Sequence, residues 1–179
     1  MKKIYFTRHG QTFWNVENKI CGVTDIGLTP TGHEQAKQLG ELIKQGNYGI
    51  DEILYSPLIR AKDTAIKISE MTGIPAREEP RLTEQCFGKF EGTARNGEEF
   101  MTAKGHFIDS YEGGESMLKL AHRVYGLLDE ISKDDKVYLL VAHNGISRVI
   151  KSYFCDMTNE EYAHFGMKNC EIIEFEINS

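Results

Sequence analysis

The sequence alternates short apolar runs, which suit buried strands, with longer segments in which apolar residues recur at helical spacing. Strands that alternate with helices favour a mostly parallel sheet covered on both faces, because each crossover lays a helix against the sheet. The predicted fold class is therefore α/β, a three-layer αβα sandwich. Strands are expected at 4–7, 50–55, 137–142 and 172–177, the last as a half-exposed edge strand.

Capping residues and glycines mark where the expected helices begin and end. A Ser or Thr oxygen, or a Pro with its fixed backbone angle, suits the first turn of a helix. Glycines at 46 and 73 suit the ends of the first two helices. The expected helix starts are Thr29-Pro30, Ser56-Pro57 and Glu115-Ser116, and a further helix passes through Ile146, Val149 and Ile150.

The length of 179 residues fits one domain that spans 1–179. Residues 85–114 depart from the alternation, because they are rich in glycine, mixed in charge and weakly periodic, with a short helix expected around 96–103. Long irregular connections are uncommon inside compact domains and often serve as lids or binding loops. We expect 85–114 to form a lid over a site.

The net charge of the chain argues against a nucleic-acid partner. Lys and Arg number 21 against 27 Asp and Glu, a net charge of -6, whereas proteins that bind nucleic acid usually carry a basic excess. No stretch approaches the roughly 18 apolar residues of a membrane-spanning helix. We therefore expect neither a nucleic-acid nor a membrane partner, and we leave monomer and homodimer open.

The cysteines indicate the expected compartment. The chain has 4 cysteines, and none of them forms a C-x-x-C pair. Such scattered cysteines are typical of a reducing interior rather than of a disulfide framework or a zinc site. The apolar run that follows Met1 is too short for a signal peptide, so the sequence predicts a cytoplasmic protein.

Two of the predicted strands end in a histidine beside a glycine-containing turn. The first is followed by Arg8-His9-Gly10 and the third by His143-Asn144-Gly145. Ligands of open parallel sheets bind beyond the carboxyl ends of the strands, so both histidines are expected at the same edge. Arg60 falls in the first turn of the helix that follows another strand, which places it near that edge.

Two guanidinium groups and two imidazoles suit a tetrahedral phosphate dianion. Arginine presents a planar fork of donors that matches phosphate oxygens, and histidine can attack phosphorus through a neutral ring nitrogen. Phosphoryl transfer depends mainly on positioning and on stabilising the equatorial oxygens. A cradle of protein cations meets this need, so we expect no metal and no cofactor.

These residues belong to an ordered set that resembles the signature of the histidine phosphatase superfamily, also called phosphoglycerate mutase-like. The resemblance covers most of the chain, and it implies the phosphoglycerate mutase-like form of the αβα sandwich. The matching motifs are Arg8-His9-Gly10-Gln11-Thr12 with Trp14-Asn15 and Asn18, Gly22-x-x-Asp25-x-x-Leu28-Thr29-x-x-Gly32, Ser56-Pro57-x-x-Arg60-Ala61-x-x-Thr64-Ala65, Leu82-x-Glu84-x-x-Phe87-Gly88-x-Phe90-Glu91-Gly92, Gly114-Glu115-Ser116 and His143-Asn144-Gly145.

The resemblance implies a role for each matching residue. His9 would take the phosphoryl group as a phosphohistidine, and Glu84 would protonate the leaving oxygen and then activate water. In many family members a second glycine follows the second histidine, whereas this chain has Asn144. The residues expected to contact the phosphoryl group or the substrate are Arg8, Asn15, Cys21, Gly22, Arg60, His143 and a backbone N–H near Asn144.

The expected activity is hydrolysis of a phosphomonoester of a small metabolite. The first alternative is a phosphoglycerate mutase, but relatives of that kind carry a longer insertion between the Glu and Gly-Glu-Ser motifs than 85–114 provides. The second alternative is an inactive module that senses phosphate, although such modules tend to lose the nucleophile. Lys89, Arg95 and Lys104 in the lid are expected either to recognise a second anionic group or only to be solvated.

Overall fold

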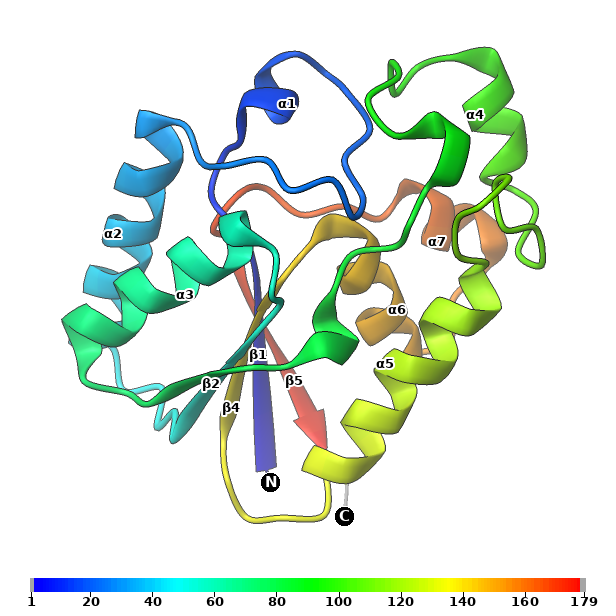
Figure 1. Ribbon diagram of the computed structural model, residues 1–179. Coiled ribbons are helices and arrows are strands. Elements are labelled where there is room, and N and C mark those ends of the chain that lie inside the picture. Colours follow the sequence, from blue (N-terminus) through cyan, green and yellow to red (C-terminus); the bar gives the residue numbers. More distant parts are fainter. Residues whose placement is uncertain (1, 178–179) are drawn as a thin grey trace.

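The computed structural model describes residues 2–177 and contains a five-stranded sheet with the order β3-β2-β4-β1-β5 (Figure 1). Strands β1 (Lys2–Arg8), β2 (Glu52–Tyr55), β3 (Ala76–Glu78) and β4 (Tyr138–Ala142) are mutually parallel. Strand β5 (Ile172–Ile177) pairs antiparallel with β1 at one edge of the sheet. The predicted α/β class with a mostly parallel sheet is confirmed.

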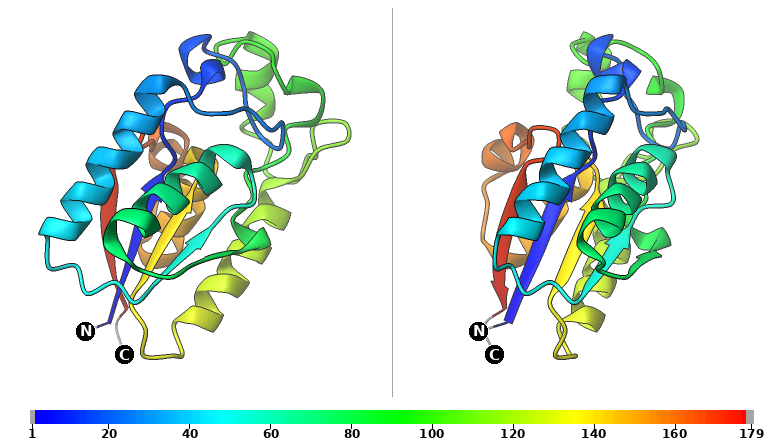
Figure 2. Two further views of the ribbon diagram at one scale, coloured as in Figure 1. Left: turned by 60° about the vertical axis from the view of Figure 1, so that its left-hand side comes forward. Right: turned by 90° about the vertical axis from the view of Figure 1, so that its left-hand side faces the viewer.

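Helices cover both faces of this sheet (Figure 2). Helices α2 (Pro30–Gln45) and α3 (Ile59–Thr72) lie on one face, and α5 (Met117–Ile131) and α6 (Asn144–Phe154) lie on the other. Alternate residues of a strand point to opposite faces. Tyr5 therefore contributes to the core under α2 and α3, whereas its neighbours in β1 contribute to the core under α5 and α6.

The predicted helix starts at Thr29 and Ser116 are confirmed, because each side-chain oxygen accepts a backbone N–H of the first turn. Gly73 ends α3 in the left-handed conformation, at φ 76°. The prediction that Ser56 caps α3 is wrong. Leu58 occupies the N-cap position without a side-chain hydrogen bond, and Ser56 is instead buried beside a histidine, where it takes part in the site described below.

Several short elements were not expected from the sequence. They are too short for a hydrophobic period to develop, since a helix shows its apolar stripe only over several turns. The short helix α4 (Glu98–Ala103) does lie within the range expected for it. The unexpected elements are β3, α1 (Phe13–Val16), α7 (Asn159–His164) and the 3₁₀ turns Pro80–Leu82 and Gly88–Phe90.

Residues 85–114 lie over the carboxyl end of the sheet and have a small core of their own (Figure 1). Phe90, Phe100 and Tyr111 from this segment are buried together with Ile20. The aromatic rings of Phe90 and Phe100 meet edge to face, with centroids 5.3 Å apart. The segment is thus largely irregular in backbone, as expected, but its aromatic side chains are packed, and its action as a lid stays a prediction.

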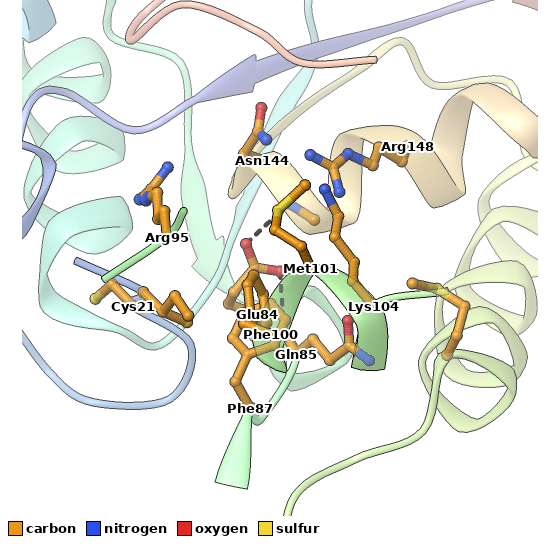
Figure 3. Close-up of a pocket in the computed structure, with 13 residues that line it drawn as sticks. Cys21, Glu84, Gln85, Phe87, Arg95, Phe100, Met101, Lys104, Asn144 and Arg148 are labelled. Carbon is orange, nitrogen blue, oxygen red and sulfur yellow. Dashed lines mark hydrogen bonds between the residues drawn. The ribbon is translucent and has the colours of Figure 1, made fainter. Parts of the chain in front are cut away.

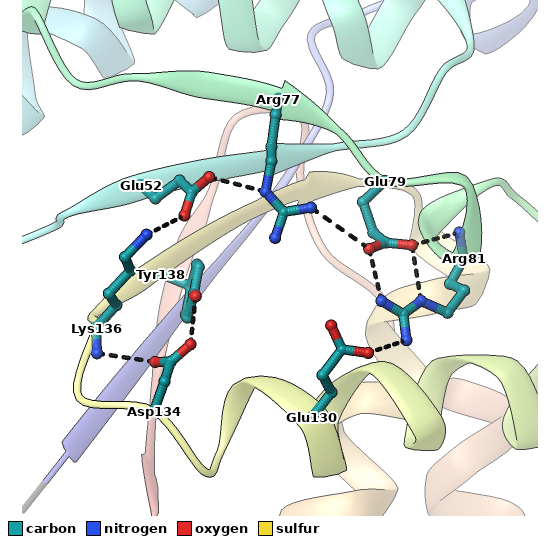
Figure 4. Close-up of polar contacts among 8 residues, drawn as sticks. All are labelled: Glu52, Arg77, Glu79, Arg81, Glu130, Asp134, Lys136 and Tyr138. Atoms are coloured by element: carbon teal, nitrogen blue, oxygen red, sulfur yellow. Dashed lines mark hydrogen bonds and ion pairs between the residues drawn. The ribbon is translucent and has the colours of Figure 1, made fainter.

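A group of ion pairs links β2, β3 and the chain after β3 to α5 (Figure 4). The Arg81 guanidinium donates from Nε and Nη2 to the two oxygens of Glu79, each at 2.8 Å, and from Nη1 to Glu130 of α5. Exposed pairs contribute only about 0–1 kcal/mol, but Glu79 is buried, so losing its partner would leave a buried charge. These contacts fix the chain just before Glu84.

Among residues 2–177, no helix is long and apolar enough to cross a membrane.

The start of α2 depends on a glycine that the backbone of the first loop approaches closely. A Cβ on Gly32 would lie 2.1 Å from the Gln11 carbonyl oxygen, whereas a Cβ on Gly126 in α5 would meet no atom within 4 Å. We expect Gly32→Ala to lower the free energy of unfolding by about 1–3 kcal/mol through this overlap. The control Gly126→Ala raises it by about 0.5–1 kcal/mol, since it removes a helical glycine.

Urea denaturation of both variants measures these changes. Equal effects of the two substitutions would contradict the close approach at Gly32.

Candidate active site

The parallel pairing of β1 with β4 brings two histidines together. Arg8 pairs in register with Ala142, so His9 and His143 follow at the same level, and the His9 N–H donates to the Ala142 carbonyl oxygen at 3.0 Å. The two rings lie with their centroids 5.2 Å apart. His9 is 4% exposed and His143 is fully buried. The structure thus brings together the two histidines that the sequence placed at one sheet edge.

The hydrogen bond of the His9 ring fixes its tautomer. Nδ1 lies 2.7 Å from the Gly10 carbonyl oxygen, which can only accept, so Nδ1 carries the proton. Burial lowers the pKa of His9 well below its usual range, and the nearby positive charges of Arg60 and Arg8 lower it further. The ring is therefore neutral, and Nε2 has its lone pair free, as a nucleophilic nitrogen requires.

His143 is held in the same buried layer by a serine from the end of β2. Its Nε2 lies 2.7 Å from the Ser56 hydroxyl oxygen. Burial lowers the pKa of His143 well below its usual range, and the charge of Arg60 acts in the same direction. His143 is therefore a neutral hydrogen-bonding group beside His9.

Arg8 and Arg60 are tied to carbonyl oxygens rather than to carboxylates. Arg60, which is 1% exposed, donates to the Thr24 and Gly22 carbonyl oxygens at 2.9 and 2.6 Å. Arg8 donates to the Met167 carbonyl oxygen at 2.7 Å. Burial lowers the pKa of Arg8 to about 10, and Arg95 adds to this effect. Both guanidinium groups are thus oriented by carbonyl oxygens, and within residues 2–177 neither forms an ion pair with a carboxylate.

Three buried nitrogens of this group have no hydrogen-bond partner within residues 2–177. They are Nε of Arg8, Nε of Arg60 and Nδ1 of His143. Buried polar groups in proteins are nearly always hydrogen-bonded, and an unpaired one costs about 1–3 kcal/mol. Orphaned donors from both arginines therefore fit an anion that binds beside His9.

Glu84 is 5% exposed and is held by two backbone N–H groups. Its Oε1 accepts from Gln85 and its Oε2 accepts from Gly145, both at 2.9 Å, as the dashed lines in Figure 3 show. A Cβ on Gly145 would lie 2.4 Å from Glu84 Oε1, so the contact requires glycine at that position. Arg123 of α5 holds the segment that precedes Glu84, because its guanidinium donates to the Arg81 carbonyl oxygen.

Gly22 and Cys21 lie on a loop that is held by a second glutamate. The Glu91 carboxylate accepts from the backbone N–H groups of Gly22 and Thr24, at 3.1 and 3.3 Å. A Cβ on Gly22 would lie 2.2 Å from the Gln85 carbonyl oxygen, so this close approach also needs glycine. Cys21 lines the cavity next to Glu84. The loop thus joins the Arg60 side of the site to the Glu84 side.

The two asparagines of the predicted site use their side-chain oxygens in local contacts. Asn15 Oδ1 accepts from the Thr12 backbone N–H in a capping box at the start of α1. Asn144 Oδ1 accepts from the Met167 backbone N–H at 2.8 Å. Their contacts with a phosphoryl group stay predictions.

Asn169 was missed by sequence reasoning. Its Nδ2 donates to the His9 carbonyl oxygen at 2.8 Å and to Asn15 Oδ1 at 3.2 Å, so it joins the two segments on either side of the first turn. It precedes β5, whose antiparallel direction carries its start to the end of β1. An antiparallel assignment of the edge strand would have been the signal, but the alternating run alone does not give strand direction.

A cavity of about 130 Å³ opens beside Glu84 (Figure 3). Arg95 and Lys104, which the sequence placed in the lid, line this cavity together with Arg148 of α6, which was not expected there. Lys89 does not line it, since its Nζ pairs with Glu99 and Glu112 at 2.7 and 2.5 Å. Within residues 2–177, no group of three or more His, Cys, Asp or Glu side chains is arranged to hold a metal ion.

Comparison with known proteins shows what the chain is similar to. The uncharacterized phosphatase PhoE of Bacillus subtilis is 34% identical over 145 residues, which are 80% of this chain and 72% of that protein. The probable phosphoglycerate mutase GpmB of Erwinia tasmaniensis is 30% identical, with 96% of this chain and 83% of that protein covered.

A solved structure has the same fold over nearly the whole chain. The native structure of the mycobacterial glucosyl-3-phosphoglycerate phosphatase superposes with a TM-score of 0.82 at 26% identity, covering 97% of this chain and 89% of that chain. The family model of the histidine phosphatase superfamily (branch 1) matches residues 4–179. With its paired histidines and clustered arginines, the chain belongs to the histidine phosphatase superfamily.

Proposed function

We propose that the protein hydrolyses the phosphomonoester of a small metabolite through a covalent phosphohistidine on His9. The observation that carries this proposal is the His9 ring itself, which is neutral, protonated on Nδ1 and flanked by orphaned arginine N–H groups. A lone pair on Nε2 is what an attack on phosphorus needs, and the cations suit the negative oxygens around that phosphorus. The phosphatase names among its relatives support the same reaction class.

The reaction has two steps in this proposal. His9 Nε2 attacks phosphorus, the bond between phosphorus and the substrate oxygen breaks, and the leaving oxygen takes a proton from the Glu84 carboxyl group. Water then attacks the phosphohistidine and gives a proton to Glu84, so that the N–P bond breaks and inorganic phosphate leaves. Both glutamate oxygens accept a backbone N–H bond, which holds the carboxyl group in one orientation for the two proton transfers.

The cations and His143 act on the phosphoryl group during both steps. Arg8 and Arg60 supply charge and N–H donors for the equatorial oxygens, which carry most of the negative charge of the transition state. His143, whose ring lies beside that of His9, adds a neutral hydrogen-bond donor. Because these groups are held by backbone carbonyls and by Ser56 before substrate binds, little reorganisation is required.

Phosphoenzyme trapping tests the covalent step. With ³²P-labelled substrate, an acid-labile and alkali-stable adduct is expected in the native protein and is absent in His9→Ala, which also loses turnover. The matched control is His33→Ala, because His33 is exposed on α2 and does not line the cavity. Near-normal turnover of His9→Ala would refute the covalent route.

The same assay separates hydrolysis from the mutase alternative, which the name of the Erwinia relative keeps open. With 3-phosphoglycerate, free phosphate is expected without an isomeric phosphoglycerate. Accumulation of the isomer would assign mutase activity instead. Tight phosphate binding with neither product would assign a sensing module.

Substitution of Glu84 separates the two proton transfers. We expect Glu84→Gln to slow the hydrolysis of alkyl phosphates about 10²–10⁴-fold, because their leaving oxygens need a proton. p-Nitrophenol leaves without one, so the variant still releases a burst of p-nitrophenol and accumulates phosphoenzyme. Stopped-flow absorbance measures the burst, and unchanged alkyl phosphate turnover would remove Glu84 from this role.

The low pKa values of His9 and His143 make stability depend on pH. The folded state keeps both rings neutral, whereas the unfolded chain binds protons below about pH 6.5. The free energy of unfolding is therefore expected to fall as pH drops below about 6.5, by up to about 1.4 kcal/mol per pH unit for each ring. Denaturant titrations from pH 7.5 to 5 measure the slope, and an unchanged slope in the His9→Asn, His143→Asn double variant contradicts the assignment.

A further inference from the structure

The cavity beside Glu84 carries more positive charge than the proposed phosphoryl chemistry uses. Arg95 comes from the lid segment before α4, Lys104 from the end of α4, and Arg148 from α6. All three line the cavity, and Figure 3 shows Arg95 on one side of the Glu84 carboxylate, with Arg148 and Lys104 on the other. We call these three side chains the distal cations. Elements far apart in the sequence thus converge on one small space.

Each distal cation is held in place by a backbone carbonyl oxygen. Arg95 Nε donates to the Lys19 carbonyl at 2.9 Å, and Arg148 Nε donates to the Phe165 carbonyl at 2.7 Å. Lys104 Nζ lies 3.4 Å from the Ala163 carbonyl. These bonds orient the side chains without pairing them to a carboxylate. Glu84 is the one acidic residue among the described residues that line the cavity, so three cations face a single carboxyl group there.

Other basic side chains of the same region are neutralised by carboxylates. Arg123 pairs with Glu115 through two hydrogen bonds of 2.8 Å, and Lys89 pairs with Glu99 and Glu112. Within the described residues 2–177, no distal cation has a carboxylate oxygen within 4 Å. The distal cations therefore differ from the solvated charges that the lid also carries.

Burial makes this arrangement costly unless an anion binds to it. The pKa of Lys104 is lowered to about 8, first by burial and then by the charges of Arg148 and Arg95. Burial also lowers the pKa values of Arg95 and Arg148. Like charges that are brought together in a partly desolvated space repel one another, and a bound anion removes that repulsion.

The position of the distal cations relates them to the leaving group. Glu84, the proposed proton donor, lines this cavity together with Asn144 and Gly145, which follow His143 in the chain, whereas His9 does not line it. An alcohol whose oxygen takes the proton of Glu84 would therefore extend from the phosphoryl site into the cavity. The cavity of about 130 Å³ is smaller than the roughly 300–1,000 Å³ of pockets for drug-sized ligands, so it suits a short alcohol. Phe87, Phe100 and Met101 supply an apolar wall for its carbon chain.

We propose that Arg95, Lys104 and Arg148 bind a second anionic group on the leaving group of the substrate. The preferred substrates are then short phosphomonoesters whose alcohol carries a carboxylate or a further phosphate. This inference rests on the proposed hydrolysis, and it narrows the substrate class of that same site. Arginine forks and a lysine match either anion, so the experiment includes both.

Three glycerol-based esters of similar size form the test series. Glycerol phosphate has a neutral hydroxymethyl end, 3-phosphoglycerate has a carboxylate there, and glycerol 1,3-bisphosphate has a phosphate. At pH 7 and constant ionic strength, kcat/KM for at least one of the two esters that carry a second anionic group is expected to exceed that for glycerol phosphate by about tenfold or more, as a charge-assisted hydrogen bond implies. The better of the two identifies the anion.

Variants of the distal cations test whether these side chains cause the preference for an ester with a second anionic group. Lys104→Gln and Arg95→Gln are each expected to reduce the ratio of kcat/KM between the better anionic ester and glycerol phosphate by about threefold to tenfold. The matched control is Lys89→Gln, which removes the same charge from the same segment but at a lysine that is paired with glutamates. This control is expected to keep the native ratio.

The outcomes distinguish this inference from the proposed function. Equal kcat/KM for all three esters, or a ratio that Lys104→Gln and Arg95→Gln leave unchanged, overturns the second anionic subsite while hydrolysis stands. Failure to hydrolyse any ester, p-nitrophenyl phosphate included, overturns the proposed function. Calorimetric affinities for the same three esters then decide the subsite, because at least one ester with a second anionic group must still bind about tenfold more tightly than glycerol phosphate.

Discussion

The parallel pairing of β1 with β4 is the constraint on which the site depends. Residues of the two strands are locked in register up to Arg8 and Ala142, and the next residue of each strand is a histidine. A shift of one residue would separate the rings and turn the side chains of β1 to the opposite faces. The same backbone hydrogen bonds between β1 and β4 therefore stabilise the buried sheet and set the geometry of the two imidazoles.

Carbonyl oxygens, rather than carboxylates, hold the arginines of the candidate site in this acidic protein. Arg8, Arg60, Arg95 and Arg148 all donate to backbone carbonyls, which orient a guanidinium without cancelling its charge. Carboxylates instead pair with basic groups elsewhere, as Glu79 does with Arg81. A net charge of -6 is thus compatible with a strongly positive interior site.

The fold class and several residues of the candidate site could be predicted from the sequence, because both follow from local patterns of residues. Apolar runs located β1, β2 and β4, and strand ends located the two histidines. Ser56 was misread as a helix cap, since a serine before a helix has the same local pattern whether it bonds to the helix or to His143. Asn169 and Arg148 escaped because their roles arise from strand direction and from tertiary packing, which leave no short-range signal.

The antiparallel edge strand also decides where the two ends of the described chain lie. Lys2 at the start of β1 is the register partner of Ile177 at the end of β5, at the edge of the sheet remote from the cavity (Figure 1). A tether, a surface attachment or a fused domain joined at either end would therefore leave access to the cavity unobstructed. The adjacency of the ends also suits covalent cyclisation, since a short linker would bridge neighbouring strands.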